Sequence, residues 1–243
     1  ISLPKDSIIN LRLFKEETSI SWDRPHFINS EKIGFGYYGK LDFSKISLVS
    51  KIPDSVNYLF TKEKDKDTIN FWLSKNSLDS LEFKLKEVDT TRTLTVKFDR
   101  SKDSIIDSLR ISDITKSVIG LKEKFKLSSN LPVREISDSL IFIRDIDSTL
   151  IPFKSSINNN LDEVTLDFDV KPQDDYSIYI LPNAIIDHRG GTNDTLGFRT
   201  RSQSLEDYGN VYLNVIRDSE SQYILQMVNS NNEIVRKYNS INS

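Results

Sequence analysis

The sequence contains no cysteine, and among its 243 residues there are only two histidines, one methionine and one alanine. The absence of cysteine excludes disulfides, cysteine-ligated zinc and thiol catalysis. No apolar run is long enough to cross a bilayer as a helix. Because alanine has the highest helix propensity, a chain whose only alanine is Ala184 is a poor helix former. The composition therefore favours β-structure.

The charges nearly cancel, since 33 basic and 36 acidic side chains give a net charge of −3. There is no basic surplus and no RNP, KH or zinc-finger pattern, so nothing points to nucleic acid. Hydrophobic residues make up 37% of the chain and charged residues 28%, which is ordinary for a globular protein that buries a core. We expect folded domains that do not bind nucleic acid.

Short segments in which apolar and polar residues alternate recur at roughly ten-residue spacing, with turn residues between them. Alternation with a period of two is the pattern of a strand with one buried face. Such segments occur at residues 33–38, 68–73, 80–85, 93–98, 164–170 and 176–181. Strands at this spacing predict a sandwich or barrel. The sequence therefore predicts an all-β fold of tandem immunoglobulin-like β-sandwiches, with partial strands of flanking β domains.

The domain boundaries follow from the same segments. Residues 1–22 are interpreted as the last strand of a preceding domain and a linker, with the strand at 7–15. One sandwich is predicted over 23–108 and a second, a bacterial Ig-like sandwich, over 109–203. Residues 204–243 are interpreted as an incomplete transthyretin-like β domain, with a polar turn at 229–232. We expect a fragment of a longer chain, so that any signal peptide lies outside it.

Two segments partly fit a helix instead. Residues 103–118 carry a broken apolar stripe, but their Ser, Thr and Ile content favours strand and linker. A single helical turn is predicted near 182–186.

A tripeptide of Asp, then Ser or Thr, then a small or aliphatic residue or Thr occurs ten times, where chance predicts about one or two occurrences. One interpretation is structural, because Asp and Ser/Thr are good turn residues and the apolar residue begins a strand. The other is functional, because the pattern resembles the O-glycosylation signal of exported Bacteroidota proteins. The acceptors would be Ser7, Ser55, Thr68, Ser80, Thr90, Ser104, Ser108, Ser139, Ser148 and Thr195.

Residues 3–8, 11–17 and 32–39 resemble the middle of the Ig-like-domain lipoproteins of Bacteroidota. The run from Phe125 to Pro132 is similar to their F-x-I-x-S-N-x-P strand, and residues 141–153 and 176–196 continue the likeness. The stretch from Phe125 to residue 196 also resembles the bacterial Ig-like domain of S-layer proteins. Residues 207–211 resemble the start of a transthyretin-like or carboxypeptidase-regulatory-like domain. The resemblance implies an upstream lipoprotein signal and Ig-like domain, and hence an outer-membrane, cell-surface or periplasmic location with a lipid anchor outside this fragment.

Motifs that carry chemistry are scarce. His26 and His188 stand alone, without His-Glu-x-x-His, and no Gly-x-Ser-x-Gly elbow accompanies them, so both are interpreted as surface or turn histidines. Gly190 and Gly191 predict a tight turn with positive φ. Gly34 and Gly36 lie inside a strand, where a bulge or close packing is expected.

Acidic residues offer one candidate metal site. Asp187, Asn193 and Asp194, around the glycine turn, form a possible calcium site, although no EF-hand loop is present. Asp167 and Asp169 alternate with apolar residues and so mark the solvent face of a strand. No catalytic residue and no cofactor are predicted.

The aromatic residues leave two interpretations open. Trp22 and Trp72 are core residues or parts of a sugar-stacking platform. Because Phe71 and Leu73 share one face of their strand, Trp72 points to the other face, which we expect loops of the other sheet or a partner to cover.

These features favour a non-enzymatic structural or interaction module of a cell-envelope lipoprotein. One concrete form is a subunit of an outer-membrane protein assembly or export complex, with other envelope or outer-membrane proteins as partners. The alternative is a carbohydrate-binding module at the cell surface. An enzyme is the least favoured class.

Overall fold

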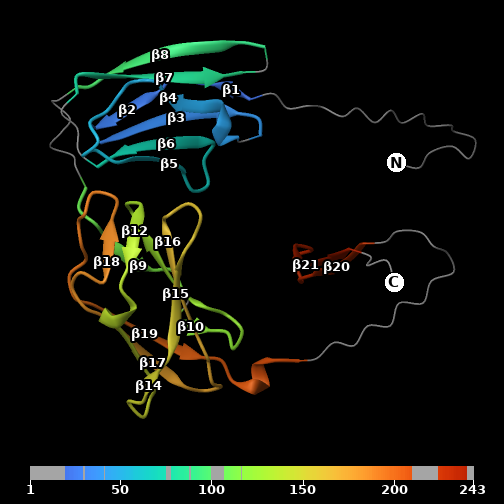
Figure 1. Ribbon diagram of the computed structural model, residues 1–243. Helices are drawn as coiled ribbons and strands as arrows, with labels where there is room; N and C mark the ends of the chain where they lie inside the picture. The colour runs from blue at the N-terminus through green and yellow to red at the C-terminus, as the bar shows by residue number, and fades with distance from the viewer. Residues whose placement is uncertain are drawn as a thin grey trace, which may run out of the picture. The chain divides into compact units, whose positions relative to one another are not determined.

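The computed structural model describes residues 20–29, 31–40, 42–74, 78–87, 89–99, 107–115, 117–209 and 224–239 (Figure 1). These residues form strands and three short 3₁₀ helices, so the all-β prediction is confirmed. The chain divides into a larger unit that ends at Leu205 and a smaller unit that begins at Glu206. No helix among the described residues has the length and apolarity needed to span a membrane.

The first sandwich lies in the larger unit and has two sheets. One sheet has the order β1-β3-β6-β5, with β2 also paired to β3, and the other has the order β4-β7-β8. The strands of the first sheet are β1 (Ser21–Trp22), β2 (His26–Asn29), β3 (Lys32–Tyr38), β5 (Tyr58–Lys62) and β6 (Thr68–Leu73). Those of the second are β4 (Ile46–Leu48), β7 (Ser80–Lys86) and β8 (Thr91–Lys97), with the 3₁₀ helix η1 (Phe43–Lys45) before β4. In chain order this is the A-B-E-D and C-F-G arrangement of an immunoglobulin domain.

The core of this sandwich is aromatic. The rings of Phe35 on β3 and Phe71 on β6 each lie 4.9 Å from the ring of Phe83 on β7. All three side chains are fully buried. The inner faces of the two sheets therefore meet around Phe83, which the alternation of β7 places inward.

The second sandwich has the same arrangement with additional strands. One sheet has the order β15-β16-β11-β9 and the other the order β10-β19-β17-β13-β14, in which β10 runs parallel to β19. The first contains β9 (Ile111–Asp113), β11 (Phe125–Ser129), β15 (Phe153–Ile157) and β16 (Glu163–Phe168). The second contains β10 (Val118–Ile119), β13 (Ile141–Arg144), β14 (Leu150–Ile151), β17 (Asp175–Ile180) and β19 (Leu196–Ser202), and the 3₁₀ helix η3 (Asp138–Leu140) precedes β13. This is again A-B-E-D, facing A′-G-F-C-C′.

A tyrosine corner supports the immunoglobulin topology. Tyr176 stands near the start of β17, the F strand, and its ring is almost fully buried beside Phe168 at 5.0 Å. Its hydroxyl accepts a hydrogen bond of 2.7 Å from the backbone N–H of Lys171 in the E–F corner. Immunoglobulin domains use a tyrosine at this place to fix the same corner.

A small third sheet joins two loops of the second sandwich. β12 (Val133–Ile136) lies in the B–C loop and pairs with β18 (Ile185–Asp187) in the F–G loop. The pairing brings both loops together at one end of the sandwich. The helical turn predicted near 182–186 is wrong, because Ala184 N–H reaches Leu181 O across a tight turn and the chain then enters β18.

The 3₁₀ helix η4 (Leu205–Asp207) spans the boundary between the two units. The smaller unit contains a hairpin formed by β20 (Ile224–Val228) and β21 (Ile234–Asn239). The polar turn predicted at 229–232 is confirmed, since Asn232 N–H donates to Asn229 O and Asn232 has a positive φ of 61°. The strand predicted at 7–15 lies outside the described residues.

One boundary differs from the sequence interpretation. Trp22, placed in the segment before the first sandwich, lies on β1, which pairs with β3. Its indole is buried in the first core, 6.2 Å from the ring of Tyr37, and its Nε1 donates to Lys86 O. The first sandwich therefore begins before residue 23, because its core needs this aromatic side chain.

Candidate functional site at the contact between the two sandwiches

The most elaborate group of polar contacts lies where loops of the second sandwich meet the first. The contributing loops are the B–C loop, the F–G loop and the D–E turn at 158–162. The first sandwich contributes the turn between β2 and β3 and the outer face of β5 and β6. This is the end of an immunoglobulin sandwich at which recognition loops gather in antibody variable domains.

The Asp187 carboxylate organises the F–G loop. Its side chain is fully buried, and its Oδ1 accepts hydrogen bonds of 2.8 Å from the backbone N–H groups of both Arg189 and Gly191. Gly190 has a φ of +93°, which confirms the predicted glycine turn. A Cβ at Gly191 would stand 2.6 Å from Asp187 Oδ2, so only glycine allows this close approach. The loop is thereby fixed before it meets the first sandwich.

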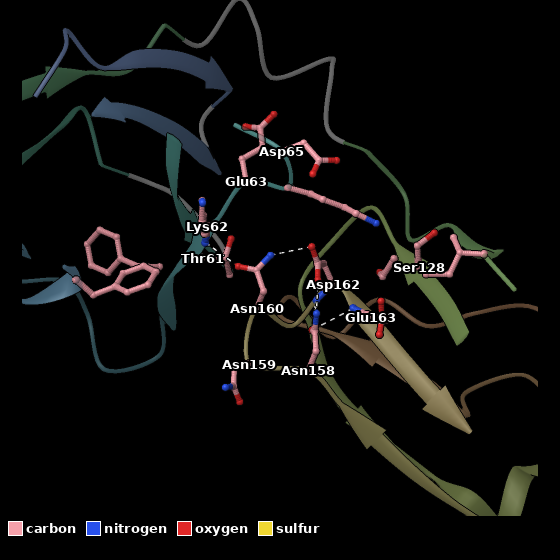
Figure 2. Close-up of a pocket in the computed structure, with 15 residues that line it drawn as sticks. Thr61, Lys62, Glu63, Asp65, Ser128, Asn158, Asn159, Asn160, Asp162 and Glu163 are labelled. Carbon is pink, nitrogen blue, oxygen red and sulfur yellow. Dashed lines mark hydrogen bonds between the residues drawn. The ribbon is translucent and has the colours of Figure 1, made fainter. Parts of the chain in front are cut away.

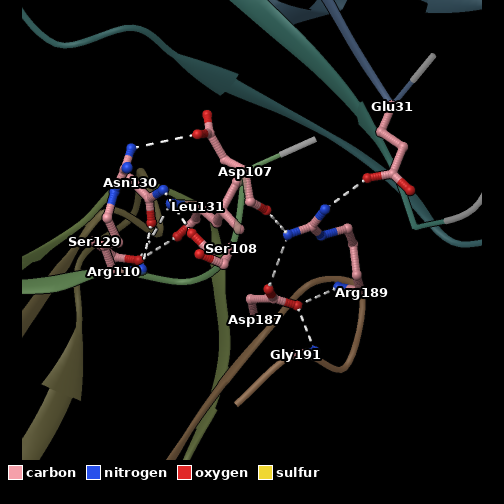
Figure 3. A network of polar contacts seen from close by, with 10 residues as sticks. All are labelled: Glu31, Asp107, Ser108, Arg110, Ser129, Asn130, Leu131, Asp187, Arg189 and Gly191. Atoms are coloured by element: carbon pink, nitrogen blue, oxygen red, sulfur yellow. Dashed lines mark hydrogen bonds and ion pairs between the residues drawn. The ribbon is translucent and has the colours of Figure 1, made fainter. Parts of the chain in front are cut away.

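Arg189 connects three parts of the chain (Figure 3). Its Nη1 donates to Glu31 Oε2 in the β2–β3 turn at 2.8 Å, and its Nη2 donates to the carbonyl oxygen of Asp107. The same Nη2 lies 3.6 Å from Asp187 Oδ2. The side chains of Arg189 and Glu31 are only 16% and 17% exposed. Removing one partner of an ion pair with so little solvent around it is costly, because the other charge is then left buried and unpaired.

Glu31 is itself held in place by its own sandwich. Its backbone N–H donates a 2.9 Å hydrogen bond to the side-chain oxygen of buried Asn29, and its carbonyl accepts from Leu73 N–H. Asn29 thus closes a local turn that presents the Glu31 carboxylate outward. Both partners of the ion pair are therefore held by hydrogen bonds within their own loops.

An aromatic contact lies next to the ion pair. The His188 ring packs edge-on against the Trp72 indole, with ring centroids 5.4 Å apart. Lys32 Nζ lies 4.5 Å above the indole, and the indole Nε1 donates to Thr61 Oγ1 at 2.9 Å. Trp72 is 6% exposed although it lies on the outer face of its sheet. The face is covered, as expected, but by the F–G loop of the second sandwich rather than by loops of the other sheet of its own sandwich.

Burial governs the protonation of this group. Desolvation lowers the pKa of His188 from 6.5 to about 4, and Arg189 adds to the effect, while Asp187 opposes it. Neither ring nitrogen makes a hydrogen bond within the described residues, although the Leu73 carbonyl has a weak opposing influence on the pKa. Burial also lowers the pKa of Lys32, against the attraction of Glu63. His188 is therefore neutral at pH 7.

A second polar contact joins the two sandwiches through the D–E turn (Figure 2). Lys62 N–H donates to Asn160 Oδ1 at 2.7 Å, and Asn160 Nδ2 donates to Asp162 Oδ2 at 2.7 Å. Asn158 Nδ2 holds the other oxygen of Asp162, also at 2.7 Å. These side chains line a groove of about 750 Å³, together with Glu63 and other residues of the β5–β6 turn.

The residues predicted for calcium have structural contacts instead. Asp187 holds the loop backbone and faces Arg189, and the Asn193 side chain accepts from Ile185 N–H and donates to the carbonyls of Leu181 and Asp194. Asp194 is exposed. No group of three or more His, Asp or Glu side chains among the described residues is arranged to hold a metal. Calcium binding stays a prediction, and the contacts favour the structural role.

The other predicted residues are dispersed. His26 is exposed, as expected, and His188 lies in a turn, as the interpretation allows, although its side chain is only 4% exposed. Asp167 and Asp169 are exposed, as predicted. Gly36 packs closely, since a Cβ there would meet Asp23 Cβ at 3.1 Å.

The tripeptide acceptors divide by exposure. Ser7 and Ser104 lie outside the described residues. Thr68 and Ser80 are half-buried at the starts of β6 and β7. The others are exposed in turns, loops or η3: Ser55, Thr90, Ser108, Ser139, Ser148 and Thr195.

The sequence interpretation missed Glu31 and Arg189. Both stand in polar turns, where charged residues are ordinary, and nothing local shows that the turns meet. The one available signal was the run Phe71-Trp72-Leu73, whose apolar character on both faces indicated a covered sheet.

The comparisons with known proteins give a fold likeness of low similarity. No family model matches the chain, and no match was found among the curated proteins. Domains 5–6 of the S-layer protein SbsC match with a TM-score of 0.27 at 8% identity, covering 76% of this chain and 99% of that one. Domains 4–9 of SbsC match at 0.27 and 9%, covering 85% and 32%. A three-domain immunoglobulin segment of titin matches at 0.22 and 12%, covering 77% and 66%. At these scores the fold rests on the strand order and the two cores.

Proposed function

We propose that this chain is a non-enzymatic structural and interaction module of the cell surface, in which the two sandwiches are held in one orientation. The observation that carries the proposal is Arg189, whose guanidinium joins Glu31 of the first sandwich, the Asp107 carbonyl and buried Asp187. Tandem domains joined only by a linker move independently by default. A nearly buried, three-way contact, whose partners are hydrogen-bonded within their own loops, opposes that motion.

The finer form of the proposal is a cell-envelope lipoprotein that spaces or presents a surface at the outer membrane. A subunit of a protein assembly or export complex is one such role, with other envelope proteins as partners. The likeness of residues 3–8, 11–17, 32–39 and 125–132 to Ig-like lipoproteins of Bacteroidota supports it. A fixed pair of sandwiches suits this role because it sets the distance and angle between two surfaces.

The chain is well suited to a direct test, because it has no cysteine. Exposed Thr95 on β8 and Lys154 on β15 can be replaced by cysteine and carry spin labels on different sandwiches. The distances between the two spin labels, measured by double electron–electron resonance, are expected to form one narrow distribution. Arg189→Ala should broaden it, because Glu31 and Asp187 then lose their shared partner.

The matched control is Arg201→Ala, which removes an arginine paired with Asp175 inside the second sandwich. It should leave the distribution narrow. A broad distribution in the unsubstituted chain, or equal broadening by both variants, would contradict the proposal.

The alternative, a carbohydrate-binding module, rests on a different feature, the hollow of about 700 Å³ on the outer face of β13, β17 and β19.

A further inference from the structure

The outer face of the A′-G-F-C-C′ sheet of the second sandwich carries a hollow of about 700 Å³. Its floor is the exposed side of β13, β17 and β19, and its rim includes Val118 and Ile146, both well exposed. The volume is in the range of sites that hold small organic ligands. The hollow lies within one sandwich, so its shape does not depend on the contact with the other.

Strand register places two arginines in one row of this floor. Arg144 on β13 pairs with Ser177 on β17, and Ser177 pairs with Arg199 on β19. All three line the hollow. The burial pattern confirms their outward direction, because Ile143, Ile178 and Thr200 on the alternate positions are buried. A serine thus stands between two arginines in this row.

These two arginines have no carboxylate partner in the described part of the chain. Arg144 Nη1 donates only to the carbonyl oxygen of Ser148, at 2.9 Å. Arg201, one row further on, is already occupied by both oxygens of Asp175 at 2.9 and 3.3 Å. Asp145 accepts from Thr149 N–H and pairs with Lys171. Arg144 and Arg199 therefore bring two positive charges to the hollow without a carboxylate partner among the described residues.

The next row supplies an open aromatic ring. Tyr179 on β17 is 43% exposed, and its partner in the ladder on β19 is Gly197. A Cβ at Gly197 would meet no atom within 4 Å, so the position next to Tyr179 on β19 is open. A flat ring with open space beside it can stack on the apolar face of a sugar ring.

We propose that this hollow binds an acidic saccharide, with the uronate carboxylate on Arg144 and Arg199 and the sugar ring against Tyr179. A guanidinium binds a planar carboxylate through two parallel hydrogen bonds, which a surface lysine does not do. An acidic peptide would satisfy the arginines, but it leaves the ring and the space at Gly197 without a role. The inference is independent of the fixed orientation of the sandwiches.

The test is a titration of the ¹⁵N-labelled chain with a trigalacturonate, followed by backbone amide shifts. Saturable shifts are expected on β13, β17 and β19, with no comparable shifts for a neutral trigalactan or for hexaglutamate. Arg199→Gln and Tyr179→Thr should each weaken binding by about tenfold or more, since each removes one of the two modes of recognition. Both side chains are exposed, and the replacements keep strand propensity, so folding is checked by the unchanged remaining spectrum.

Arg134→Gln is the matched control, because it removes one positive charge from β12 of the same sandwich, outside the hollow. Its effect on affinity should be less than about twofold. Absence of saturable shifts at millimolar trigalacturonate would overturn the inference. If hexaglutamate bound as tightly as trigalacturonate, the inference would be overturned, because charge alone would explain the binding. If trigalactan bound as tightly as trigalacturonate, the inference would also be overturned, because the arginines would have no role.

Discussion

The His188 ring of the second sandwich packs edge-on against the Trp72 indole of the first, with centroids 5.4 Å apart. One ring comes from an F–G loop and the other from the outer face of a sheet 116 residues earlier in the chain. Because Lys32 Nζ already lies over the indole, a positive charge on His188 would add a second cation to the same small space. The burial of this contact therefore favours the neutral form of His188.

We expect acid to weaken the fold through His188. The pKa of this ring is lowered in the folded chain from 6.5 to about 4, so the unfolded chain takes up the proton first as pH falls. This contribution to stability is fully present above pH 6.5 and is lost as pH falls from 6.5 towards 4. Between pH 7 and about pH 4.5 the loss in unfolding free energy should be about 2 kcal/mol. Urea denaturation at both pH values measures it.

His188→Gln should reduce this loss, because glutamine has no proton to gain. His26→Gln is the control, since His26 is exposed. Carboxylates contribute to the acid sensitivity of the parent chain and of both variants. The contribution of His188 is therefore the difference in stability loss between His188→Gln and His26→Gln. If His188→Gln loses as much stability in acid as the parent chain, the attribution to this ring is wrong.

Arg189 is expected to stabilise the loop as well as the contact. Arg189→Ala should cost about 2 to 4 kcal/mol of unfolding free energy, because it leaves the fully buried Asp187 without its ion-pair partner. Adding Asp187→Asn should recover part of the loss, since the amide carries no charge. Arg201→Ala, which breaks an exposed pair, should cost no more than about 0.5 kcal/mol. Equal losses for the two arginines would contradict the role given to Arg189.

The strands were predictable from the sequence because each needs only a local pattern. The alternation at 80–85 and at 176–181 matches β7 and β17, whose inward residues fill the two cores. The Gly190 turn was also predictable from a local signal, because glycine has no Cβ and therefore adopts a positive φ without strain.

The contact between the sandwiches was not predictable, because it joins turns that are far apart in sequence. His188 in a polar loop gives no local sign that Trp72 will cover it, and Glu31 looks like any solvated turn residue. The arginine row on β13 and β19 was hidden for a similar reason. Arg144 and Arg199 become neighbours of Ser177 only once the pairing of three strands is known.

Gly191 is expected to be intolerant of any side chain. A Cβ at this position would stand 2.6 Å from Asp187 Oδ2, a distance that forces the buried carboxylate to move. Gly191→Ala should cost at least about 1 kcal/mol of unfolding free energy, as overpacking of a tight site does. Gly197→Ala is the control, because nothing lies within 4 Å of its Cβ position, and it should change stability by less than about 0.5 kcal/mol. Similar effects of the two substitutions would show that the F–G loop adapts.

The two interpretations of the Asp-Ser/Thr tripeptides can be separated by mass. In a Bacteroidota host that carries the glycosylation machinery, we expect sugar only on the exposed acceptors among the described residues: Ser55, Thr90, Ser108, Ser139, Ser148 and Thr195. Thr68 and Ser80 should stay unmodified, because each is half-buried and pairs in a ladder, with Gly36 and Lys97 respectively. Glycopeptide mapping of the purified chain, alongside its intact mass, tests this.

Asp54→Asn provides the matched comparison, since it alters the signal at Ser55 while keeping a good turn residue. It should remove sugar from Ser55 and leave the other acceptors unchanged. The exposed positions lie mostly in turns, so their placement fits both interpretations equally well. Only the covalent sugar distinguishes them, and an unmodified intact mass would leave the tripeptides as turn formers that begin strands.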